Sequence, residues 1–100
     1  MSLIEEKQLG IQLICTRLGV EKLFAFGSVN RNDFGPESDV DFLVEIGNKD
    51  PLAYTETYFA LAEELEHLLG RKVDLVTKNS LQNPYFIKSV EASKKLIYAA

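Results

Sequence analysis

The chain has one cysteine among its 100 residues, and no internal disulfide is therefore possible. Cys15 falls on the apolar face of an expected helix, which predicts a packed core residue. No apolar run reaches the ~20 residues that a membrane helix needs, and the first residues lack the basic start and apolar run of a signal peptide. We therefore expect a cytoplasmic protein with no membrane partner.

Positive charge is also scarce. The 11 Lys and Arg residues are outnumbered by 15 Asp and Glu residues, which gives a net charge of -4. Arg71-Lys72 and Lys94-Lys95 are the only adjacent basic pairs. Proteins that bind nucleic acid usually carry a basic stripe, so nucleic acid is not an expected partner.

The composition is that of a globular protein. Hydrophobic residues make up 46% and charged residues 26% of the chain, close to the averages for folded domains. The length suits a single domain over residues 1–100. A core of this size is modest, and a binding partner would add stability.

Apolar residues at helical spacing predict a helix over 3–18 and another over 51–69. Asp50 and Pro51 have the chemistry of an N-cap and a first helical position, and Gly70 ends the second run. Asn83-Pro84 predicts the start of a third helix.

Short apolar segments between these helices have the character of strands. Residues 27–38 are rich in loop-forming types, with room for one helical turn after Ser28. The order predicts an α/β or α+β fold, with a small mixed β-sheet flanked by helices. The expected strands are 22–26, 40–44, 73–76 and, at the end, 96–98.

Gly27-Ser28 is followed after ten residues by Asp39-Val40-Asp41. Glycine lets the backbone approach phosphate closely, and N–H groups near a helix start favour anions. Ser28 adds a hydroxyl, and we expect Arg31 to reach the same phosphates. The first half of the pattern therefore suits a nucleotide.

The second half suits a metal. Alternation along a strand points Asp39 and Asp41 to one side, where Mg²⁺ would be held by one or two carboxylates plus substrate phosphates. Asp74 adds a carboxylate on an expected neighbouring strand. Three aspartates could hold two metal ions for an in-line displacement at phosphorus, and Asp74 could also accept the proton of the attacking hydroxyl.

Each part alone is more often structural: Gly-Ser is usually a turn, and Asp-x-Asp is often a solvated strand end. Their combination resembles the DNA polymerase β-type nucleotidyltransferase superfamily. The short length resembles its minimal nucleotidyltransferases (MNT), the antitoxins of prokaryotic toxin–antitoxin pairs. The resemblance extends from the first helix to Leu96-Ile97-Tyr98. It implies the nucleotidyltransferase fold, Mg²⁺, ATP and a partner HEPN-domain toxin, which is neutralised by binding and, in some systems, by AMP transfer to a tyrosine.

The resemblance assigns roles to particular residues. Gly27 and Ser28 correspond to nucleotide-binding positions, as does Arg31, which matches a second basic position. Val29 is a departure, because many relatives have arginine directly after Gly-Ser. The metal-binding catalytic carboxylates that the motif match implies are Asp39, Asp41 and Asp74.

Little chain lies outside this constellation and its scaffold. A pocket for the acceptor would therefore have to be shaped by a partner protein or a second copy. A binding module that neutralises its partner by occlusion is an alternative, favoured by Val29. A small-molecule nucleotidyltransferase of the antibiotic-modifying kind ranks lower, since such relatives carry more chain, and a DNA polymerase ranks lower still.

Overall fold

A computed structural model describes residues 3–27 and 39–100 and has a mixed α+β fold, as expected. All three expected helices and all four expected strands are present within these ranges. Two of the helices have the expected bounds, the strands extend one or two residues further, and a short 3-10 helix was not expected. In chain order the elements are α1 (Leu3–Leu18), β1 (Val20–Phe26), β2 (Val40–Ile46), α2 (Pro51–Leu69), β3 (Val73–Thr77), η2 (Lys78–Ser80), α3 (Pro84–Ser93) and β4 (Lys95–Ala99).

The helix ends follow the capping chemistry of the sequence. The Asp50 carboxylate accepts a hydrogen bond from the N–H of Ala53 at 3.0 Å, at the start of α2. Gly70 ends the same helix in the left-handed conformation, with φ of 64°. Asn83 caps α3 by accepting from two N–H groups of its first turn. Local sequence therefore determines where these helices begin and where α2 ends.

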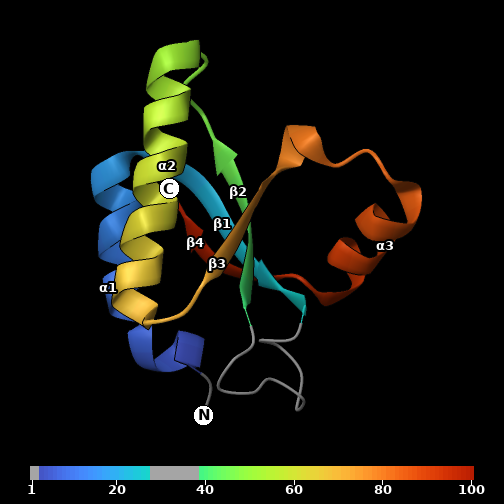
Figure 1. Ribbon diagram of the computed structural model, residues 1–100, viewed down its shortest axis with the longest axis horizontal. Coiled ribbons are helices and arrows are strands. Elements are labelled where there is room, and N and C mark those ends of the chain that lie inside the picture. Colours follow the sequence, from blue (N-terminus) through green and yellow to red (C-terminus); the bar gives the residue numbers. More distant parts are fainter. Residues whose placement is uncertain (1–2, 28–38) are drawn as a thin grey trace.

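The sheet of the described residues has the strand order β3-β2-β1-β4 (Figure 1). β1 pairs antiparallel with both β2 and β4, whereas β2 and β3 are parallel. A parallel pair needs a long crossover between its strands, and α2 forms that crossover. The sheet is therefore mixed, as the element order predicted.

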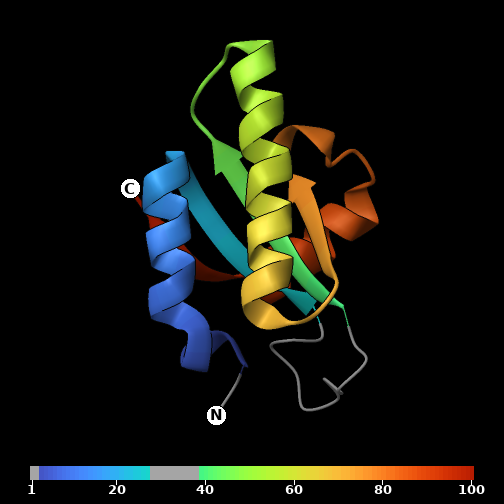
Figure 2. The ribbon, with the colours of Figure 1, turned by 60° about the vertical axis from the view of Figure 1, so that its left-hand side comes forward.

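α1 and α2 pack side by side on one face of the sheet (Figure 2). Alternate residues of the strands supply the core there, including Leu23, Phe42 and Val44. Cys15 of α1 is fully buried among them, which confirms its predicted place in the core. Within the described part of the chain, no helix combines the length and apolar character that crossing a bilayer requires.

α3 lies on the opposite side of the sheet from α1 and α2 (Figure 1). Val90 of α3 is buried against Phe26 of β1 and Leu43 of β2, in a second, smaller apolar cluster. The ring of Phe86 also meets that of Phe26 edge to face, with centroids 6.0 Å apart. The second face of the sheet is thus only partly covered, and its strand ends carry the candidate site.

Candidate active site

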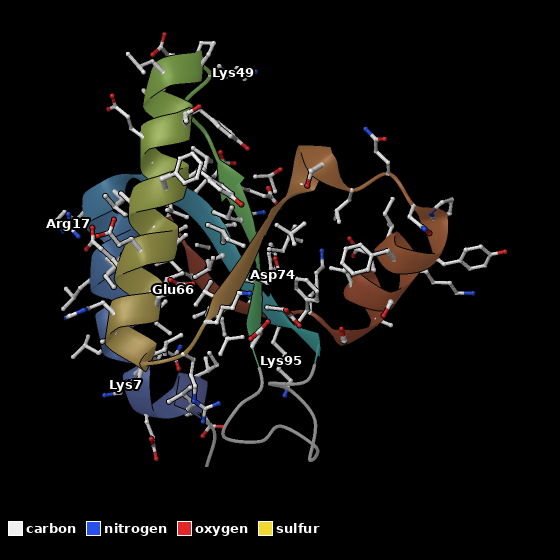
Figure 3. The ribbon with its side chains drawn as sticks, in the orientation of Figure 1. Lys7, Arg17, Lys49, Glu66, Asp74 and Lys95 are labelled. Carbon is white, nitrogen blue, oxygen red and sulfur yellow. The ribbon has the colours of Figure 1, made fainter. Side chains whose placement is uncertain are left out.

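The sheet register places two of the expected carboxylates on neighbouring strands. Asp41 of β2 lies opposite Asp74 of β3 in the parallel pair and opposite Phe26 of β1 in the antiparallel pair. Asp41 is half-buried and Asp74 is exposed. Two residues further along, Leu43 and Val76 belong to the α3-side cluster, so alternation puts both aspartates on that face. Figure 3 shows Asp74 on β3.

Gly27 brings the end of β1 against Asp41. Its φ of +75° lies in the left-handed region, which favours glycine. A Cβ at this position would stand 2.6 Å from Oδ2 of Asp41, a separation that real Cβ atoms essentially never show. The glycine of the Gly-Ser pair is therefore needed both for the turn and for the space that the Asp41 carboxylate occupies.

The end of α3 reaches the same turn. The N–H of Gly27 donates a long hydrogen bond of 3.4 Å to Oγ of Ser93. Ser93 in turn donates to the carbonyl oxygen of Ser89 at 3.0 Å, within α3. The two ends of the Gly27–Ser93 contact are 66 residues apart, so no local pattern in the sequence indicates it.

The remaining expected site residues are placed less fully. Asp39 lies one residue before β2 and is exposed. Ser28 and Arg31, together with Val29, lie outside the described residues. The loop expected over 27–38 is likewise described only at Gly27.

The donor set can be compared with the needs of a metal ion. Among the residues that the structure describes, no three His, Cys, Asp or Glu side chains form a ready-made metal group. The expected three-aspartate set therefore stays a prediction. Mg²⁺ characteristically takes one or two protein carboxylates and completes its shell with phosphates and water. The half-buried Asp41, with Asp74 beside it on the next strand, fits that manner of binding.

Cys15 has no place in this chemistry. It is fully buried on the other face of the sheet, and burial raises the pKa of its thiol from 9.0 to about 12. A thiol is nucleophilic only as the thiolate, so Cys15 is an inert core residue.

Comparison with known proteins gives the class. A family model for the nucleotidyltransferase domain matches residues 10–97. A Methanocaldococcus jannaschii protein assigned as a protein adenylyltransferase is 44% identical over 79 residues, which are 79% of this chain and 76% of the relative. The chain belongs to the nucleotidyltransferase domain family. The protein adenylyltransferase MntA of Thermococcus cleftensis is 42% identical over 67 residues, 67% of this chain and 65% of that protein.

Solved structures share the fold. A minimal nucleotidyltransferase is 28% identical, with a TM-score of 0.67 and 95% of each chain covered. A toxin–antitoxin crystallised with AMP-PNP is 22% identical, with a TM-score of 0.70 over 93% of this chain and 73% of that one. A third structure is the complex of a tri-AMPylated Shewanella oneidensis HEPN toxin with MNT antitoxin. It contains a chain that is 21% identical, with a TM-score of 0.56 over 93% of this chain and 73% of that one. The resemblance to minimal nucleotidyltransferases is thus confirmed.

Proposed function

We propose that this protein transfers AMP from ATP to a hydroxyl group, a tyrosine, of a partner HEPN-type toxin and thereby neutralises the toxin. The observation that carries the proposal is the register that sets Asp41 beside Asp74, with Gly27 against Asp41. The relatives named as protein adenylyltransferases support the reaction. The structural neighbour that contains an AMPylated HEPN toxin supports a toxin of this kind as the acceptor.

The nucleotide would be held from two sides. Ser28 would offer its backbone N–H and its hydroxyl to the triphosphate, Gly27 would let the backbone approach the phosphates closely, and Arg31 would offer positive charge. Val29 stands where many relatives have arginine, so the phosphates would depend more on Arg31 and the backbone. We expect Val29→Arg to lower the KM for ATP.

The carboxylates serve the reacting phosphate. Asp39, Asp41 and Asp74 would hold Mg²⁺ as a pair of ions, and bound Mg²⁺ would stabilise charge on the attacking and leaving oxygens. Asp74, exposed on β3, would take the proton of the acceptor hydroxyl. The hydroxyl oxygen forms a bond to the α-phosphorus, the bond from that phosphorus to the bridging oxygen breaks, and pyrophosphate leaves with the bonding electrons.

The intact mass of the partner tests the proposal. The toxin is incubated with this protein, ATP and Mg²⁺, and its mass is compared with that of untreated toxin. We expect a gain of one or more AMP groups, which is lost in the Asp39→Ala, Asp41→Ala double variant. Glu63→Ala is the control, because Glu63 is an exposed acid on α2 away from the site. An unmodified toxin, or equal modification by the double variant, would overturn the proposal.

Val29 also supports a second candidate, neutralisation by occlusion without AMP transfer. The double alanine variant separates the two functions when it is co-expressed with the toxin. Full protection by that variant would favour occlusion, whereas loss of protection would favour transfer.

A further inference from the structure

Asp74 lies on an edge strand. Among the described residues, β3 pairs only with β2. The carbonyl oxygen of Lys72 accepts from the N–H of Val40 on β2. Backbone groups alternate in direction along a strand, so those of Val73 and Leu75 point away from β2, toward the open edge. These are the residues directly before and after Asp74.

Two side chains of α2 bond to those edge groups. Oε2 of Glu66 accepts the N–H of Val73 at 3.0 Å. The hydroxyl of Tyr58 donates to the carbonyl oxygen of Leu75 at 2.6 Å. Figure 3 shows Glu66 on α2 beside the strand that carries Asp74. The backbone is thus held on both sides of the aspartate by one helix.

We propose that Tyr58 and Glu66 are positioning residues for the carboxylate of Asp74 in the transfer reaction. The inference rests on the proposed function, in which Asp74 takes the proton of the acceptor. A parallel strand pair is somewhat less stable per residue than an antiparallel one, and a strand with one neighbour frays more readily. The two hydrogen bonds limit that fraying at the point where a small displacement of the carboxylate would slow the reaction.

Glu66 is one of three acids near the end of α2, with Glu63 and Glu64, a pattern typical of a solvated helix face. The structure shows another role, because the Glu66 carboxylate accepts a hydrogen bond from the backbone of β3. Tyr58 packs against the core and also donates its hydroxyl to that strand. Covering a strand edge is by itself a structural role, so the test has to separate edge protection from positioning.

Four α2 variants provide that separation. Glu66→Ala removes the acceptor, whereas Glu66→Gln keeps an amide oxygen that can accept the same N–H. Tyr58→Phe removes only the hydroxyl and retains the ring, which meets Phe59 edge to face. Tyr54→Phe is the matched control, since Tyr54 is a half-buried tyrosine one turn earlier on the same helix.

Initial rates of AMP transfer to the toxin are measured at a temperature where circular dichroism shows every variant folded. We expect Glu66→Ala and Tyr58→Phe each to lower kcat about tenfold, as removal of a supporting partner often does, with the KM for ATP within about twofold. Glu66→Gln and Tyr54→Phe should retain wild-type kcat. An unchanged kcat in Glu66→Ala and Tyr58→Phe, or equal losses in Glu66→Gln and Glu66→Ala, would overturn the proposal.

Amide hydrogen exchange distinguishes failure of the positioning proposal from failure of the proposed function. Exchange at the Val73 N–H should be faster in Glu66→Ala than in the wild type, and close to the wild type in Glu66→Gln. A wild-type protein that shows this pattern but transfers no AMP would refute the proposed function while leaving the Glu66 contact intact. Unchanged exchange in Glu66→Ala would refute the contact itself.

Discussion

At the scale of single residues, the candidate site is shaped by the close approach of Gly27 to Asp41. The left-handed φ and the absence of a Cβ serve different needs, the first in the turn and the second in the space for the carboxylate. Gly19 has the first of these needs without the second. It has a similar φ of +73°, but a Cβ added there would meet nothing within 4 Å.

Gly27→Ala should therefore be more damaging than Gly19→Ala. Each substitution places alanine in the left-handed region, at a cost of about 1 kcal/mol in the free energy of unfolding. Only Gly27→Ala also displaces the Asp41 carboxylate, and we expect AMP transfer to fall about a hundredfold, with little change in Gly19→Ala. Urea unfolding and transfer rates check this, and equal activity of the two variants would contradict the role of the contact.

Cys15 gives a prediction about pH. Burial raises the pKa of its thiol above the unfolded value of 9.0 to about 12, so the neutral thiol stabilises the folded state. This contribution is fully present below pH 9 and is lost as the pH rises toward 12, at about 1.4 kcal/mol per pH unit. The free energy of unfolding should therefore fall less steeply above pH 9 in Cys15→Ala than in the wild type. If urea unfolding gave the same slope of this free energy against pH for both proteins, the thiol would not be desolvated in the folded state.

At the scale of elements, α3 connects the sheet to the site. Its buried Val90 packs against Phe26, the last residue of β1. Its own last residue, Ser93, accepts a hydrogen bond from the N–H of Gly27, which directly follows β1. The helix thus supports the end of β1 beside Gly27, the first residue of the expected nucleotide-binding pair.

Val90→Ala should loosen this support. Removing two buried methyl groups from the small cluster should lower the free energy of unfolding by about 2 kcal/mol. Tyr85→Ala is the comparison, because Tyr85 lies on the same helix with 86% of its surface exposed, and its loss should cost no more than about 0.5 kcal/mol. Equal losses in urea unfolding would mean that α3 is not anchored through Val90.

The helices could be predicted closely because their start and stop signals are local. Asp50, Gly70 and Asn83 act on neighbours within a few residues. The strands and the adjacency of Asp74 to the Asp-x-Asp strand were also expected, since alternation is local and the element order favours a mixed sheet. Contacts made through packing were not foreseeable. Ser93 meets a residue 66 positions away, and Glu66 reaches Val73 across the Gly70 turn.

At the scale of the whole molecule, the fold and the site use different parts of the sheet. The main core lies under α1 and α2, whereas the aspartates lie at strand ends on the α3 side. Of the three expected metal-binding carboxylates, those of Asp39 and Asp74 are exposed and that of Asp41 is half-buried, so none belongs to the buried core.

Removal of divalent metal should therefore stop the reaction without unfolding the protein. We expect EDTA to abolish AMP transfer and leave Tm unchanged, and excess Mg²⁺ to restore the rate. Differential scanning fluorimetry and transfer assays on the same samples check this. A large fall in Tm would make the metal structural, and full activity in EDTA would exclude Mg²⁺ from the mechanism.

AMP transfer means that the α-phosphate of ATP moves to the acceptor, in this proposal at the site of Asp41 and Asp74. The most direct measurement uses ATP labelled at either the α- or the γ-phosphate, with the partner toxin as acceptor. We expect α-label to enter the toxin and γ-label not to enter it, and we expect Asp41→Asn to abolish the incorporation. Incorporation of γ-label, or α-label transfer undiminished in Asp41→Asn, would contradict AMP transfer at this site.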